Sequence, residues 1–182
     1  MSYPVWSANF DDVEAAMRRV AQRHPDLPVE LFMLSRLLVG LGRDLTANSD
    51  ELMRAHGISE GELRVLMLLF GYPDGTANPG SLVANTAHSP ANITRIADGL
   101  VERGLITRLP SEEDRRCVVL RITRRGEALV HSLLPSLSER IRRTYSDFSM
   151  AEIRQLTTDL RRVASALAEA AAGERPVEQQ SP

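Results

Sequence analysis

The chain has one cysteine, no lysine and only four histidines among its 182 residues. A single thiol, Cys117, excludes an internal disulfide framework and is compatible with a reducing compartment. The histidines never stand three or four residues apart from one another, and none pairs with Cys117 at a spacing typical of zinc sites. We therefore expect no metal ion and no other cofactor.

The chain also lacks a glycine-rich phosphate loop and any serine or cysteine in a recognisable nucleophile motif. These absences predict a protein that is not an enzyme. No cationic stretch followed by an apolar run opens the chain, and its longest apolar run, near Leu31–Leu45, is interrupted by Arg36 and Arg43. Signal peptides and membrane spans need uninterrupted apolar runs, so we expect a cytoplasmic protein without a membrane partner.

Charge is unevenly distributed along a chain whose composition, with 43% hydrophobic and 25% charged residues, is that of a soluble domain. The formal net charge is −2, which excludes a bulk polycation that coats nucleic acid. Residues 89–125, however, contain eight arginines and five acidic residues, a local charge of +3. That is a modest basic patch of the kind that a module reading a nucleic-acid groove needs.

This basic stretch begins with a predicted helix. Ser89 is a good N-cap, and Pro90 suits the first helical position because its missing N–H costs nothing there. Apolar residues recur with helical spacing on one face, at Ile93, Ile96, Ala97, Leu100 and Val101. The opposite face carries Ala91, Asn92, Thr94, Arg95 and Asp98. Short polar side chains and an arginine near a helix N-terminus suit insertion into a DNA major groove.

A β-hairpin is predicted directly after Gly104, which ends the helix. Its strands are Leu105–Leu109 and Val118–Ile122, with Val118, Leu120 and Ile122 sharing one face, and its tip, residues 110–116, is too charged for a core. A helix followed by a basic hairpin indicates a winged helix-turn-helix in a mainly α chain. The alternative for the tip is an ordinary solvated turn.

The flanking segments are predicted to be helical. Helices are expected from Phe10 to His24, from Pro28 to Ala55, after the capping box Ser59/Glu62, from Pro79 after the turn at residues 74–77, after Thr123 with a kink at Pro135, and after the capping box Ser149/Glu152. We expect an N-terminal extension and dimerisation helix over 1–57, a DNA-binding lobe over 58–123, C-terminal dimerisation helices over 124–172 and a disordered tail over 173–182.

Two seams of apolar residues at alternating spacings of three and four need partners. One comprises Leu31, Leu34, Leu38, Leu41 and Leu45, and the other comprises Ile153, Leu156, Leu160, Val163 and Leu167. One alternative is a bundle within the monomer. A short chain would bury both seams there with difficulty, so we favour a homodimer with Leu31, Leu34 and Ile153 in its interface.

The stretch GLITRLPSEEDRRCVVLRITRRG resembles the wing of the MarR family of bacterial regulators, whose pattern is roughly G-L-I-x-R, a loop, D-x-R and then L-T-x-x-G. Together with NITRIADGLVERG, it is most similar to the EmrR/MprA branch, which represses multidrug-efflux operons. The resemblance covers about residues 28–172. One departure is Arg121-Ile122-Thr123, where the family usually has a small residue followed by Leu-Thr, a change that is conservative for packing.

The resemblance implies a homodimeric repressor of efflux or stress-resistance genes, bound to double-stranded DNA at a pseudo-palindromic operator. In the D-x-R pattern Asp114 would hold Arg116 in the minor groove, and Arg115 is a candidate partner for Asp98. Arg95 is the candidate reader of guanine, and Asn92 would read adenine or bind phosphate. The candidates for phosphate contacts are Ser81, Ser89 and Thr94.

The family also implies a small aromatic or phenolic effector that releases the DNA. Its crevice would be lined by Ser35, Leu38, Glu60, Leu63, Arg64, Met67, Leu137 and Ile141. An activator or a regulator of catabolic genes would have the same residues, and a helical protein-interaction scaffold is an alternative of a different class. A redox role for Cys117 is disfavoured, because the redox branch of the family places its cysteine near the start of the first long helix.

Overall fold

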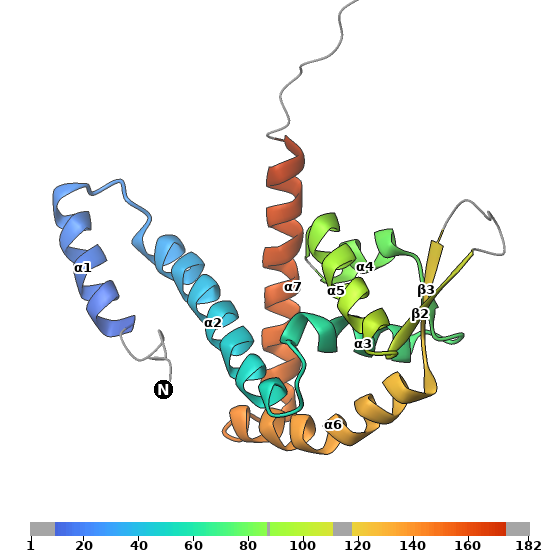
Figure 1. Ribbon diagram of the computed structural model, residues 1–182. Coiled ribbons are helices and arrows are strands. Elements are labelled where there is room, and N and C mark those ends of the chain that lie inside the picture. Colours follow the sequence, from blue (N-terminus) through green and yellow to red (C-terminus); the bar gives the residue numbers. More distant parts are fainter. Residues whose placement is uncertain (1–9, 87, 111–117, 174–182) are drawn as a thin grey trace, which may run out of the picture. The chain divides into compact units, whose positions relative to one another are not determined.

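The computed structural model describes residues 10–86, 88–110 and 118–173 (Figure 1). Asp114, Arg115, Arg116 and Cys117 therefore lie outside the described residues. The chain divides into two compact units at Pro135. This proline stands inside a helix, where it removes one backbone hydrogen bond.

The first unit contains most of the secondary structure. In chain order its elements are α1 Phe10–Arg23, α2 Val29–Arg54, α3 Glu60–Gly71, β1 Thr76–Ala77, α4 Pro79–Thr86, α5 Pro90–Glu102, β2 Ile106–Pro110, β3 Val118–Ile122 and the first half of α6 Arg124–Thr144. The predicted mainly helical fold is thus confirmed, and the predicted ends of the first two helices and of both hairpin strands agree within one residue.

The β-sheet has three strands in the order β1-β3-β2, all antiparallel. The prediction of a turn over residues 74–77 missed β1, in which Thr76 pairs with Arg121 of β3. Two residues are too few to show the alternation of apolar and polar side chains that indicates a strand, so β1 is defined only by its pairing with β3. In β3, Leu120 and Ile122 are buried, whereas Val118 is 45% exposed because it lies at the end of the strand.

One hydrophobic core joins α3, α4, α5 and the start of α6 to the sheet. Figure 1 shows α3, α4 and α5 gathered beside the β2–β3 ribbon. Side chains less than 2% exposed come from every layer of the core and include Leu66, Leu69, Leu82, Ile93, Leu100, Ile106, Leu120 and Val130. The buried face of α5 is the face that the spacing of its apolar residues predicts. This core holds α5 and the hairpin in place.

The start of α6 is packed tightly against the turn between α5 and β2. Gly104 has φ +67°, as expected of a glycine that ends a helix, and the chain turns directly into β2. Thr123 Oγ1 accepts a hydrogen bond from the Gly126 N–H at 3.1 Å and donates to the Gly104 and Leu105 carbonyls. A Cβ at Gly126 would lie 2.2 Å from the Leu105 oxygen, so only glycine fits here.

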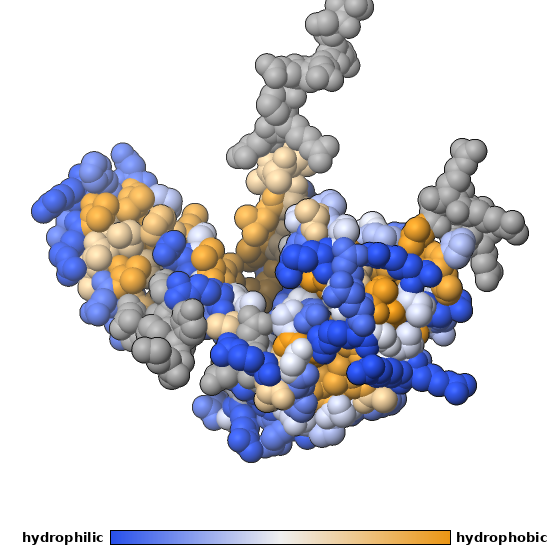
Figure 2. Space-filling view, viewed as in Figure 1, coloured by the Kyte–Doolittle hydropathy of each residue, from blue (hydrophilic) through white to orange (hydrophobic). Residues whose placement is uncertain are grey.

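The second unit contains the rest of α6 and α7 Met150–Gly173. The predicted capping box is confirmed, because Ser149 Oγ accepts from the Glu152 N–H at 3.3 Å and Glu152 Oε2 accepts from the Ser149 N–H at 2.8 Å. No residue of α7 is buried. Leu156 and Leu160 are 43% and 40% exposed, and Figure 2 shows hydrophobic residues open to view along α7.

The seam on α2 is also largely uncovered, with Leu31 66% and Leu34 45% exposed. Both seams therefore present apolar area to solvent within a single chain. No helix within the described residues combines the length and the apolarity required to cross a membrane.

Candidate DNA-binding surface

Helix α5 presents a small polar surface at its N-terminal half. Ser89 caps the helix with its Oγ accepting from the Asn92 N–H at 3.3 Å, as the sequence predicts. Pro90 occupies the first turn. The exposed side chains of the predicted outer face are Ala91, Thr94, Arg95 and Asp98, and Asn92 beside them is half-buried.

Asn92 and Arg95 are held to each other. The Arg95 guanidinium donates from Nη2 to Asn92 Oδ1 at 2.8 Å. On its other side, Asn92 Nδ2 lies 3.1 Å from Nδ1 of His88, in the turn between α4 and α5. The two residues predicted to contact bases therefore form part of one hydrogen-bonded chain, which orients Arg95 before any DNA arrives.

Asp98 links the helix to the hairpin through a partner that the sequence analysis did not name. Its carboxylate accepts from Arg108 Nη2 on β2 at 2.5 Å, and both side chains are about half-exposed. The predicted partner, Arg115, lies outside the described residues. Arg108 was overlooked because its charge sits on a strand and not at the tip, and because alternation places it on the same face as the buried Ile106, although the Arg108 side chain itself is exposed.

The three candidates for phosphate contacts differ in their available protons. Ser81 donates from both its N–H and its Oγ to Asn78 Oδ1, which caps α4, at 2.7 and 3.0 Å. Thr94 Oγ1 donates to the Pro90 carbonyl at 3.0 Å. Ser89 Oγ instead acts as an acceptor in its hydrogen bond with Asn92. Because a phosphate needs a donor, Ser89 is the best placed of the three hydroxyls.

Helix α3 is tied to the C-terminal ends of both helices of the helix-turn-helix. Arg103, at the end of α5, lies 3.2 Å from Glu62, which also completes the capping box with Ser59. Arg64 pairs with Glu60 and donates to the Thr86 carbonyl at 3.2 Å, at the end of α4. Glu62 thus links α3 directly to the end of α5, and Glu60 orients Arg64, which links α3 to the end of α4.

The predicted effector residues are divided between the two units. Glu60 and Arg64 are paired with each other, Leu63 is buried, Leu38 and Met67 are half-buried, and the Ser35 hydroxyl donates to the Leu31 carbonyl. Leu137 and Ile141 belong to the second unit. Glu60, Leu63, Arg64 and Met67 all belong to α3, and Arg64 is engaged by Glu60 and by the Thr86 carbonyl.

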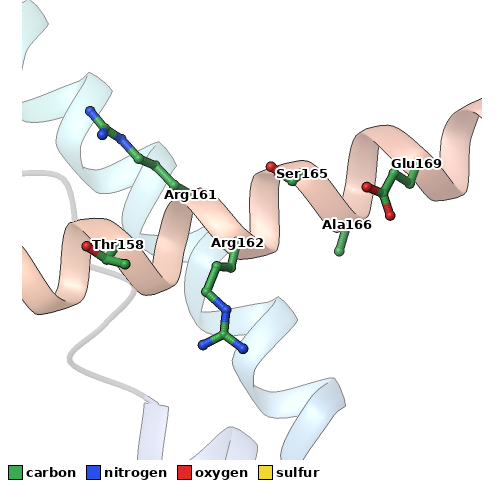
Figure 3. A pocket seen from close by; sticks show the side chains of 6 residues that line it. All are labelled: Thr158, Arg161, Arg162, Ser165, Ala166 and Glu169. Carbon is green, nitrogen blue, oxygen red and sulfur yellow. The ribbon is translucent and has the colours of Figure 1, made fainter.

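A hollow of about 430 Å³ lies along α7 (Figure 3). Its lining residues are Thr158, Arg161, Arg162, Ser165, Ala166 and Glu169. All six come from one helix, and Arg161 and Arg162 point in opposite directions in Figure 3. Since an enclosing site needs walls from several elements, we assign no ligand to this surface. Within the described residues, no group of three or more histidines, cysteines or acids is arranged to hold a metal ion.

Comparisons with known proteins agree with this geometry. The model of the MarR family matches residues 58–118. "Transcriptional repressor MprA" of Escherichia coli K12 is 31% identical over 160 residues, which cover 88% of this chain and 91% of that relative. An operator-DNA complex of a mutant E. coli MarR has a TM-score of 0.67 at 22% identity, covering 76% of this chain and 98% of that one.

A third similar structure is that of Bordetella bronchiseptica BpsR, whose DNA binding is regulated by 6-hydroxynicotinic acid. It has a TM-score of 0.64 at 22% identity, and the match covers 71% of this chain and 91% of that one. At such identities the structural likenesses establish the winged-helix fold alone.

Proposed function

The chain belongs to the MarR family of transcriptional regulators, and from this premise we propose that it is a homodimeric repressor of a pseudo-palindromic operator. Members of this family are DNA-binding regulators and not enzymes. The observation that carries the proposal is the exposed N-terminal face of α5, on which Asn92 already orients Arg95. The E. coli relative MprA is a transcriptional repressor, which supports repression over activation for this chain.

We propose that DNA contacts divide into readers and positioners. Arg95 reads a guanine, with Asn92 beside it, while Ser81, Ser89, Ala91 and Thr94 approach the backbone. Asp98 fixes the hairpin to the helix through Arg108. From the resemblance of the D-x-R pattern to the family's wing, we propose that Arg116 enters the minor groove with Asp114 and Arg115 next to it.

We further propose that α2 and α7 form the dimer interface. The support is the exposed apolar seams, because single chains rarely leave such long helical stripes open to water. Residues 1–57 and 124–172 would then pair two copies around the DNA-binding lobes of residues 58–123. With two lobes related by a dyad, the operator should have half-sites roughly 10–10.5 bp apart.

The proposed effector is a small aromatic or phenolic compound, and the proposed targets are efflux or stress-resistance genes. We propose that the protein acts in the cytoplasm. The support is the similarity to MprA and to BpsR, whose DNA binding is regulated by 6-hydroxynicotinic acid, a hydroxylated aromatic acid. Ser35, Leu38, Glu60, Leu63, Arg64, Met67, Leu137 and Ile141 remain the candidate contacts. An effector that prefers a dimer with mis-spaced α5 helices would shift the population away from DNA.

Fluorescence anisotropy with a DNA fragment from upstream of the gene tests the DNA-binding proposal. Arg95→Ala should weaken operator binding by about 1–3 kcal/mol and relax preference at one base pair in each half-site. Arg19→Ala, an exposed arginine on α1, is the matched control and should bind like the wild type. A wild-type protein whose affinity shows no steep salt dependence would instead favour the protein-interaction scaffold.

A titration with salicylate tests the effector separately. We expect it to weaken operator binding with an affinity in the micromolar range or weaker, about −8 kcal/mol at most. If salicylate binds the protein without changing its DNA affinity, the proposed release mechanism is wrong and the repressor assignment stands.

A further inference from the structure

The imidazole of His88 is wedged between the first turns of two helices. On the α5 side, its Nδ1 lies 3.1 Å from Nδ2 of Asn92. On the α3 side, its Nε2 is so close to Gly61 that a Cβ there would lie 3.0 Å away. Within the described residues, Nε2 is also the one buried side-chain nitrogen or oxygen without a hydrogen-bond partner. The ring is therefore fixed by packing on one edge and by a single hydrogen bond on the other.

The direction of that hydrogen bond follows from its neighbour. Arg95 can only donate, so the Asn92 atom that faces it at 2.8 Å must be the carbonyl oxygen Oδ1. The Asn92 amide nitrogen Nδ2 then faces His88 and donates to Nδ1. A neutral imidazole that accepts at Nδ1 carries its proton on Nε2. Arg95 thus donates to Asn92, and Asn92 donates to His88, which is the last acceptor of this hydrogen-bonded chain.

We propose that His88 is a positioning residue for the base-reading arginine. By accepting from Asn92 it fixes which way the amide points, and the amide in turn provides the oxygen that orients Arg95. The proposal rests on the proposed function, in which Arg95 contacts a base. His88 itself contacts no DNA in this scheme, so its contribution is to discrimination between sequences and not to charge attraction.

Protonation of His88 reverses this arrangement. The imidazolium carries hydrogens on both nitrogens, so Nδ1 becomes a donor that faces the Asn92 Nδ2 donor. The amide must then rotate and turn its NH₂ group toward Arg95, which loses its acceptor. Histidine is the side chain that ordinarily exchanges a proton between pH 5 and 8.

The charged groups around His88 are distributed over both packed helices. Arg95 faces it from α5 through Asn92. On α3, Arg64 pairs with Glu60 and reaches the carbonyl of Thr86, two residues before His88. The other acid of this turn, Glu62, is held by Arg103 at the end of α5. Both acids are thus engaged with arginines, and Asn92 is the hydrogen-bond partner that responds to the proton.

The experiment compares wild type, His88→Asn and His88→Leu on the operator and on an operator with the Arg95-contacted base pair replaced. Asparagine places Oδ1 near the position of the histidine Nδ1 and cannot be protonated, whereas leucine keeps bulk without an acceptor. The readout is the Kd for the altered operator divided by the Kd for the operator, measured from pH 7.5 to 5.5. A high ratio means strong discrimination between the two sequences. General effects of pH on affinity cancel in this ratio.

We expect the wild-type ratio to fall about 2- to 10-fold as pH decreases, the range for one neutral hydrogen bond. His88→Asn should keep the high ratio at every pH, and His88→Leu should show the low ratio throughout. His56→Asn, at an exposed histidine outside this contact, should behave as wild type. A His88→Leu protein that discriminates like the wild type at every pH would overturn the positioning role.

A measurement without DNA separates this proposal from the proposed function. The nitrogen chemical shifts of His88 at pH 7.5 should identify the tautomer protonated on Nε2, and the Nδ1-protonated tautomer would overturn the proposal regardless of DNA binding. Conversely, a wild type with the expected tautomer that binds operator and scrambled DNA equally would overturn the proposed function. If His88→Leu does not fold, the pH profiles of wild type and His88→Asn decide, because only the former should change.

Discussion

Replacing Gly126 with alanine adds one methyl group at the point where α6 leaves the wing. The new Cβ would lie 2.2 Å from the Leu105 carbonyl oxygen and 2.8 Å from Cγ1 of Ile122. Carbon and oxygen atoms that touch are ordinarily roughly 3.3–3.6 Å apart, so the first turn of α6 must retreat by about 1 Å. The obstacle is a backbone atom of the core, which cannot rotate away as a flexible side chain would.

The expected cost follows from what this retreat disrupts. Overpacking of a core typically costs about 1–3 kcal/mol. The Leu105 oxygen also accepts from the N–H and Oγ1 of Thr123 at 3.0 and 3.1 Å, and each weakened bond costs about 1 kcal/mol. The higher helix propensity of alanine returns at most about 1 kcal/mol. We therefore expect Gly126→Ala to lower the free energy of unfolding by about 2–4 kcal/mol.

Urea unfolding followed by circular dichroism measures this difference, at one protein concentration because dimerisation contributes to stability. The matched control is Gly99→Ala in α5, where the nearest atom to a new Cβ is Glu62 Oε1 at 3.7 Å. That variant should equal the wild type or exceed it by up to about 1 kcal/mol. A Gly126→Ala protein as stable as the wild type would refute the close approach of α6 to Leu105.

Three further predictions concern the seams, the link between helix and wing, and the turn before β1. Leu156→Asp combined with Leu160→Asp should yield monomers in analytical ultracentrifugation and abolish operator binding, and a folded double variant that remains dimeric would contradict the α7 interface. A double-mutant cycle on Asp98 and Arg108 should give a coupling of about 0.2–1 kcal/mol, because both side chains are half-exposed, and a coupling well above this would show that solvent screens the pair less than its exposure implies. Hydrogen bonds from the Thr76 hydroxyl, and to a lesser extent from the Thr76 backbone N–H, lower the pKa of Asp74. Its contribution is therefore present above the ordinary aspartate pKa and is lost as pH falls through the lowered one, so the difference in Tm between wild type and Asp74→Asn should vanish in acid.

Helix ends and the face of α5 were predictable from the sequence because their determinants are local. Ser59 with Glu62, and Ser149 with Glu152, satisfy backbone N–H groups within a single turn, and the structure confirms both capping boxes. Gly104 ends α5 through a backbone conformation that disfavours other residues. Such signals act over about four residues, which is the reach of one side chain along its own helix.

Sequence periodicity was equally informative about which residues are buried, and less so about which polar side chains meet. The apolar face of α5 follows from its spacing, yet Asp98 pairs with Arg108 on a neighbouring strand. Arg64 pairs with Glu60, four residues before it, but it also donates to the Thr86 carbonyl, 22 residues further along the chain. Long charged side chains bond with whichever group lies nearest in space, and periodicity carries no information about that distance.

The remaining features were decided by tertiary packing alone. Strand β1 is only two residues long, and it exists because Thr76 and Ala77 find the open edge of β3. His88 lies only four residues before its partner Asn92, but its second contact, with Gly61, exists because α3 packs beside it. Gly126 is required only because α6 begins against the Leu105 carbonyl. Local sequence thus determined the elements and their buried faces, while contacts between elements determined the pairings, since these depend on distances that no single segment encodes.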